Sequence, residues 1–135
     1  MDRDALNAIK AAVQKQRTFK VDIEGRGFTL VLPTPHERQV AYLQAGGTTD
    51  LGVWTIAVRR LLEASLVDWV NVTVDDIAGN GDNTVATFDR ELVPLLLDSK
   101  TEWTAELSNE LTARIAVHKQ NVKGAKKKSV TTSPG

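Results

Sequence analysis

Apolar positions near the start of the chain recur with the period of a helix. Between residues 4 and 16, Leu6, Ile9 and Val13 are spaced by four or three, which places them on one helical face. The alanines among them favour helix by intrinsic propensity. The pattern predicts a short amphipathic helix.

Beyond this segment the period changes to two. Two alternating runs are separated by Gly25-Arg26-Gly27, and their apolar residues are Phe19, Val21, Ile23, Phe28, Leu30 and Leu32. Alternation on both sides of a glycine turn predicts a β-hairpin. Since a lone hairpin is marginal in water, its apolar face must lie against the helices or against a partner chain.

Cap chemistry marks two further helices. Thr34, Pro35 and Glu37 have the order of an N-cap, a first helical proline and the end of a capping box. Gly46-Gly47 predict the end of that helix. Thr49 or Asp50 can cap the next one, whose apolar positions are Trp54, Val58, Leu61 and Leu62.

The middle of the chain is less regular. Residues 66–72 have the composition of a strand or of an extended connector, and residues 75–84 read as a polar loop. Phe88 can staple a short helix that starts near Asp89 and has a kink or a delayed start, because Pro94 lies deep in it. The residues expected to be buried there are Leu92, Leu95 and Leu96.

The longest predicted helix begins at a second capping box, Ser99 to Glu102. Its apolar stripe has a spacing of four and consists of Trp103, Leu107, Leu111 and Ile115. We therefore expect an α+β, mainly helical fold: an N-terminal helix and a β-hairpin, about four more helices and a disordered C-terminal tail. Residues 1–120 would form a single globular domain, and residues 121–135 a disordered basic tail.

Charge is distributed unevenly over the 135 residues, although its sum is zero. Residues 1–60 carry nine basic and six acidic side chains, residues 61–110 two and eleven, and residues 111–135 six and none. Because phosphate contacts need clustered lysine and arginine, the acidic body argues against binding of nucleic acid. With no cysteine, no secretory signal and no apolar span, the pattern favours a cytoplasmic protein without membrane contact.

Candidate chemical sites are few. The chain has two histidines, His36 and His118, and neither has companions at metal-ligand spacing. Asp75, Asp76 and Asp82 are acidic loop residues without the register of a calcium loop. We predict no enzyme activity, no catalytic residue, no cofactor and no metal.

The order of segments resembles that of the tail assembly chaperones of long-tailed, siphovirus-like bacteriophages. The resemblance covers roughly residues 28–120. It is carried by the strand-to-helix transition Pro33-Thr34-Pro35-His36-Glu37, by Leu66-Val67-Asp68-Trp69-Val70-Asn71-Val72 after a central apolar helix, and by Phe88-Asp89-Arg90-Glu91-Leu92 with Leu95-Leu96 before a final amphipathic helix.

The resemblance implies a role in virion morphogenesis without bond chemistry. Such proteins bind the tape measure protein, help to recruit tail-tube subunits, act in the host cell cytoplasm and are absent from the mature virion. It also implies a homo-oligomer and a longer product made by ribosomal frameshifting, for which Lys126-Lys127-Lys128 could be encoded by a slippery run.

Protein–protein interaction needs exposed apolar surface. The hairpin face, Trp69 and the stripe of the last helix are the candidates, and the partner-binding residues expected are Phe19, Val21, Phe28, Leu30, Trp69, Trp103, Leu107, Leu111 and Ile115. An alternative is that both stripes form the core. Alternative functions are a small structural tail or head-completion subunit of the virion, or a phage regulator that binds a host protein.

Overall fold

The hairpin predicted from alternation forms two strands of a three-stranded antiparallel sheet. The computed structural model describes residues 2–46 and 51–131, with side chains for 2–46 and 55–117. Strand β1 (Thr18–Ile23) pairs with β2 (Arg26–Val31), and β2 pairs with β3 (Leu66–Val70), in the order β1-β2-β3. Of the two alternatives predicted for residues 66–72, a strand or an extended connector, the structure has the strand, as β3.

The hairpin turn is tighter than predicted. Glu24 and Gly25 both have positive φ, 49° and 82°, the signature of a two-residue type I′ turn. Arg26 and Gly27, which the sequence assigned to the turn, lie in β2 and pair with Ile23 and Asp22. The right-handed twist of the strands favours this turn, so the strands extend further than glycine spacing alone suggests.

In the described chain one α-helix precedes the sheet, two connect β2 to β3 and three follow β3. They are α1 (Arg3–Arg17), α2 (Pro35–Gln44), α3 (Leu51–Ser65), α4 (Val74–Ala78), α5 (Val93–Ser99) and α6 (Thr101–Thr131). The capping box of α2 is present in full between Thr34 and Glu37. The cap of α3 at Thr49 or Asp50 lies outside the described residues.

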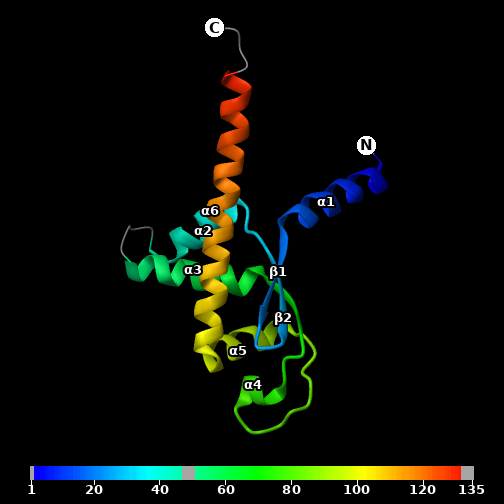
Figure 1. Ribbon diagram of the computed structural model, residues 1–135, viewed down its shortest axis with the longest axis vertical. Coiled ribbons are helices and arrows are strands. Elements are labelled where there is room, and N and C mark those ends of the chain that lie inside the picture. The colour runs from blue at the N-terminus through cyan, green and yellow to red at the C-terminus, as the bar shows by residue number, and fades with distance from the viewer. Residues whose placement is uncertain (1, 47–50, 132–135) are drawn as a thin grey trace.

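The core lies between the sheet and helices α3, α5 and α6 (Figure 1). On the sheet side it contains Phe28, Leu30 and Leu66, all fully buried. Leu62 of α3 and Leu107 of α6 reach it from the helical side. The predicted α+β, mainly helical fold with an N-terminal helix and hairpin is therefore confirmed.

Two local predictions are wrong. Residues 75–84 are not a loop throughout, because Thr73 and Asp76 form a capping box that starts α4, and Gly79 ends it in the left-handed conformation. The predicted burial of Leu95 fails as well: it is 54% exposed, while Val93 and Leu97 are buried. A 3-10 turn (η1, Arg90–Leu92) precedes α5 and shifts its inward face. This is the delayed start predicted from Pro94.

Helix α6 projects well beyond the body at its C-terminal end (Figure 1). Its backbone is helical to Thr131 and so extends into residues 121–135, for which the sequence predicts a disordered tail. Residues 132–135 lie outside the described residues, and disorder of this segment stays a prediction. Within the described chain, no helix has the length and hydrophobicity needed to cross a bilayer.

Candidate partner-binding surface

The residues predicted to bind a partner lie in the core or against it. Seven of the nine are buried, and the other two, Val21 and Ile115, are partly buried against the same cluster. The hairpin face and the stripe of α6 cover each other: the rings of Phe28 and Trp103 meet edge to face, with centroids 6.0 Å apart. The alternative that the two stripes form the core is the arrangement in the structure.

The two tryptophans on that list also have their polar atoms satisfied inside the chain. Trp69 donates its indole N–H to the Ala86 carbonyl at 2.8 Å and packs edge to face on Phe88. Trp103 donates to the Glu24 carboxylate at 2.9 Å. A tryptophan that is buried and hydrogen-bonded within its own chain offers little to a partner.

Helix α1 has the opposite character, because none of its residues is buried. Asp2 caps it by accepting the Ala5 backbone N–H at 2.8 Å, and the alanines supply helix propensity. Its apolar stripe is half exposed: Leu6 at 41%, Ile9 at 49% and Val13 at 47%. Figure 1 shows α1 leaving the body as an arm.

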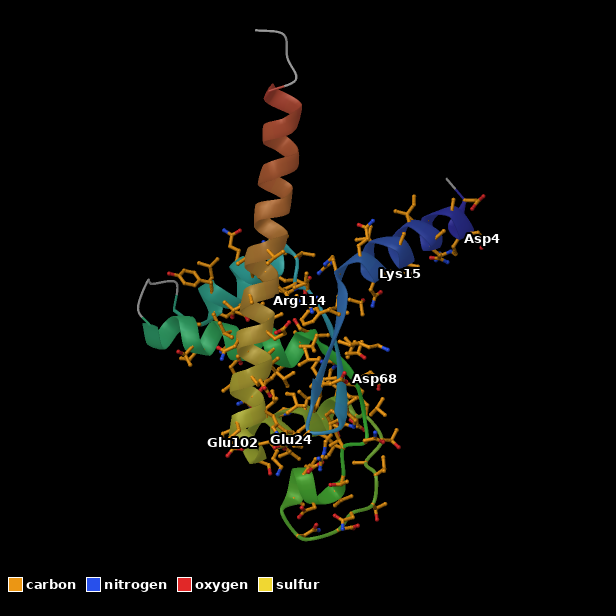
Figure 2. The ribbon with its side chains drawn as sticks, in the orientation of Figure 1. Asp4, Lys15, Glu24, Asp68, Glu102 and Arg114 are labelled. Carbon is orange, nitrogen blue, oxygen red and sulfur yellow. The ribbon has the colours of Figure 1, made fainter. Side chains whose placement is uncertain are left out.

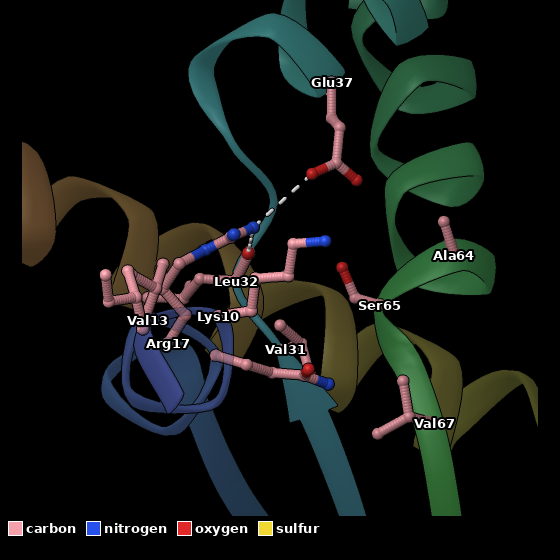
Figure 3. A pocket seen from close by; sticks show the side chains of 11 residues that line it. Lys10, Val13, Arg17, Val31, Leu32, Glu37, Ala64, Ser65 and Val67 are labelled. Carbon is pink, nitrogen blue, oxygen red and sulfur yellow. Dashed lines mark hydrogen bonds and ion pairs between the residues drawn. The ribbon is translucent and has the colours of Figure 1, made fainter. Parts of the chain in front are cut away.

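The arm is fixed at its root. Arg17 donates to the Leu32 carbonyl and forms an ion pair with Glu37, N to O 3.4 Å (Figure 3). Leu32 in turn donates its backbone N–H to the Arg17 carbonyl at 2.7 Å, and β1 follows α1 without an intervening residue. These contacts set the direction in which α1 leaves the sheet.

The same contacts act on the charge of Glu37. Partial burial alone would raise the pKa of Glu37, but the backbone N–H and hydroxyl of Thr34, together with Arg17, lower it below its ordinary value. Glu37 therefore stays ionised and keeps both its capping role in α2 and its pairing with the root of α1.

A cleft of ≈ 440 Å³ separates α1 from the sheet, and we call it the α1 cleft (Figure 3). Its apolar wall combines Ile9 and Val13 of α1 with Val31 and Val67 of the sheet, and its polar rim includes Lys10. The remaining lining residues are Gln14, Arg17, Leu32, Glu37, Ala64 and Ser65. An open apolar cleft with a polar rim is suited to a partner side chain or helix.

A second hollow lies between two helices on another part of the surface, and we call it the α3–α6 groove. Its volume is ≈ 1000 Å³. The α3 wall contains Thr55, Ile56, Val58, Arg59 and Arg60, and the α6 wall contains Thr101, Thr104, Ala105, Ser108, Asn109, Thr112, Ala113 and Ala116. Because most of the α6 residues are small, another helix could approach the α6 backbone closely.

Acidic side chains flank the α6 wall of this groove. Glu102 and Glu106 line a neighbouring hollow of ≈ 470 Å³ together with Asp22 and Glu24 of the hairpin. Figure 2 shows Glu24 beside Glu102 at this end of the body. The hollow carries negative charge, but in the described residues no group of three or more His, Asp and Glu side chains is placed to hold a metal.

The residues weighed for chemistry have local structural roles. His36 is exposed in the first turn of α2, and the side chain of His118 lies outside the described residues. Asp75 and Asp82 accept backbone N–H groups of Gly81 and Thr84 and so shape the loop after α4. Asp76 is buried and receives a bidentate pair of hydrogen bonds from Arg26, at 3.1 and 3.0 Å.

Sequence reasoning missed the α1 cleft and the α3–α6 groove. The small residues Ala105, Ser108, Thr112 and Ala116 form a second stripe at helical spacing beside the buried one, and this signal was present in the sequence. The exposure of α1 had no such signal, since its pattern is that of a buried amphipathic helix. Comparison with protein-family models, with curated proteins and with solved structures finds no match for this chain.

Proposed function

We propose that this chain is a tail assembly chaperone of a long-tailed bacteriophage, which binds helical segments of the tape measure protein and helps to recruit tail-tube subunits. Two observations support the proposal. The segment order of residues 28–120 resembles that family, and the apolar stripe of α1 stays about half exposed among the described residues. The protein-binding part of the proposal rests on the exposed apolar stripe of α1.

Energetics favour a partner for α1. Isolated helices shorter than about 12–15 residues are marginal in water, and α1 has 15 residues with none buried. Complete burial of an aliphatic side chain contributes about 1.5–3 kcal/mol, so covering the exposed half of each of three contributes about 1 kcal/mol apiece. A gain of this size suits contacts that form and release repeatedly during assembly.

The shape of the surface favours a helical client. An amphipathic helix binds through anchors three and four residues apart laid into an apolar groove. The α1 cleft offers such a groove between Ile9 and Val13 on one side and Val31 and Val67 on the other. Long, partly apolar helices that would aggregate alone are the expected clients.

Co-expression with the tape measure protein of the same genome tests the proposal. The wild-type chain should increase the soluble fraction of the tape measure protein and be recovered with it in a pulldown. The double variant Ile9→Glu/Val13→Glu should lose at least about tenfold of this binding, because charge replaces the apolar contact. Asn7→Glu/Ala11→Glu is a matched control, since it adds the same charge at the same spacing on the opposite face of α1.

Wild-type protein that neither binds nor solubilises the tape measure protein would end the proposal. Mass spectrometry of purified virions separates it from the structural-subunit alternative, because a chaperone is absent from the particle. Stoichiometric recovery of the chain in virions would favour a tail or head-completion subunit.

A further inference from the structure

The α3–α6 groove and helix α1 are complementary surfaces of the same chain. The groove presents small side chains along α6 and the half-exposed Ile56 on α3. Helix α1 presents three aliphatic side chains on one face. Each surface is the kind that the other would cover.

Charge is arranged to match as well. In α1, Arg3, Lys10 and Arg17 recur every seven residues and so form a basic edge along one side of the apolar stripe. In α6, Glu102, Glu106 and Glu110 recur every four residues beside the small-residue wall, and Glu110 is already paired with Arg114. The rise of about 1.5 Å per residue separates Arg3 from Lys10 by about 10 Å and Glu102 from Glu106 by about 6 Å, a difference that long basic side chains can span. Arg17, the third member of the basic row, is already engaged with Leu32 and Glu37 of its own chain.

The arm does not reach the groove of its own chain. Helix α1 continues directly into β1, and Arg17 fixes that junction through Leu32 and Glu37. Figure 1 shows α1 and the N-terminal half of α3 on opposite sides of α6. A second copy of the chain can present its α1 without this restriction.

Antiparallel pairing of α1 with α1 is less favourable than docking in the groove. In an antiparallel pair of these helices the basic edges would lie against each other, which is repulsive. In the groove, the same edge would face the glutamates of α6. On the opposite wall Arg59 is already paired with Glu63 and Asp98.

We infer that α1 of one copy docks in the α3–α6 groove of another, with Arg3 and Lys10 facing Glu102 and Glu106. Copies thereby cover each other's apolar surfaces when no client is present. A client that binds α1 competes with this contact. The competition rests on the proposed function, whereas the self-association does not.

Exchange of the two charge rows tests the contact. We would measure the mass of the full chain by sedimentation equilibrium for Glu102→Lys/Glu106→Lys and for Arg3→Glu/Lys10→Glu. Each variant should self-associate at least about tenfold more weakly than wild type, because like charges meet in the groove. An equal mixture should regain the wild-type association, since each α1 then meets a groove of opposite charge.

Lys15→Glu, on the face of α1 opposite the apolar stripe, is the control and should leave association unchanged. Far-UV circular dichroism should show the same helix content in all variants. A wild-type chain that stays monomeric, variants that associate as wild type does, or a mixture that fails to recover would each overturn the inference.

A groove variant separates this inference from the proposed function. Ala105→Arg alters an exposed residue of the groove and should abolish self-association while leaving the α1 surface intact. It should bind the tape measure protein at lower concentrations than wild type does, because the competing contact is gone. If neither the wild-type chain nor any variant binds the tape measure protein, the proposed function fails, while the charge-exchange result on self-association stands. If Ala105→Arg still self-associates as wild type does, the α3–α6 groove is excluded as the docking site.

Discussion

Asp76 is a carboxylate with a side chain only 3% exposed, and it joins two distant parts of the chain. It accepts the Thr73 backbone N–H at the start of α4 and two N–H groups of Arg26 from β2. Burial alone would raise the pKa of Asp76, but these hydrogen bonds and the charge of Arg26 hold it below its ordinary value. The ionised form is therefore the one that the fold stabilises.

Replacement of Asp76 with Asn should lower the free energy of unfolding by about 2–4 kcal/mol at neutral pH, because Arg26 loses its partner in a partly buried site. A carboxyl whose pKa is lowered by folding contributes stability above its unfolded pKa and loses it as pH falls through the folded value. Urea unfolding below about pH 5 should thus show a weaker pH dependence in the variant than in wild type.

Asp98→Asn is the matched control, since the same chemical change falls on a carboxylate that is 71% exposed and pairs with Arg59. It should change stability by less than about 1 kcal/mol. Equal effects of the two substitutions would contradict a special role for Asp76.

Thr34 is a second residue whose role is local. Its hydroxyl accepts the Glu37 backbone N–H at 3.1 Å, and Glu37 returns the bond to the Thr34 N–H. Thr34→Ala should cost about 1 kcal/mol of unfolding free energy. Thermal unfolding measures this, with Gln39→Ala on the exposed side of α2 as the control; no loss relative to the control would show that the cap contributes nothing.

At the scale of elements, the sequence predicted what depends on neighbours along the chain. The alternation of Phe19, Val21 and Ile23 was sufficient for β1, and the Thr34 box was sufficient for the start of α2. The short helix α4 also has a local signal, the capping box of Thr73 and Asp76, from which the sequence could have predicted it. Burial of Leu97 instead of Leu95 depends on the 3-10 turn before α5, which periodicity does not report.

Periodicity predicts that a helix has an apolar stripe, but it does not predict which part of the molecule covers that stripe. The stripe of α6 at Trp103 and Leu107 and the stripe of α1 at Leu6 and Ile9 have the same helical signature. One is buried against the hairpin and the other is exposed. The candidate surface therefore had to come from the arrangement of the elements, and seven of the nine residues predicted to bind a partner lie in the core.

The exposure of α1 predicts its dynamics. With no buried residue to hold it, α1 should exchange its backbone amide hydrogens much faster than residues 101–111 of α6, where Trp103, Leu107 and Leu111 are buried. Hydrogen-exchange mass spectrometry at low protein concentration measures this. Asp2→Ala should accelerate exchange in α1 further and leave the unfolding midpoint of the body unchanged, whereas a lowered midpoint would mean that α1 is part of the cooperative fold.

At the scale of the whole molecule, charge separates along the chain while its sum stays at zero. Residues 61–110 carry a net charge of −9, from two basic and eleven acidic side chains, and the basic edge of α1 lies on the arm. A neutral chain with separated charges attracts its own copies in particular orientations. Its association should therefore depend on ionic strength, in contrast to a purely apolar contact.

Raising sodium chloride from about 0.05 M to about 0.5 M shortens the Debye length from about 14 Å to about 4 Å and screens exposed charges at the rim of the α3–α6 groove. The self-association constant of wild type should fall several-fold, because Arg3 and Lys10 lose much of their attraction to Glu102 and Glu106. The Ala105→Arg variant should stay monomeric at both salt concentrations, because its arginine blocks the groove. Association that strengthens with salt would indicate an apolar contact without the charge rows, and the pairing of α1 with the glutamates of α6 would then be wrong.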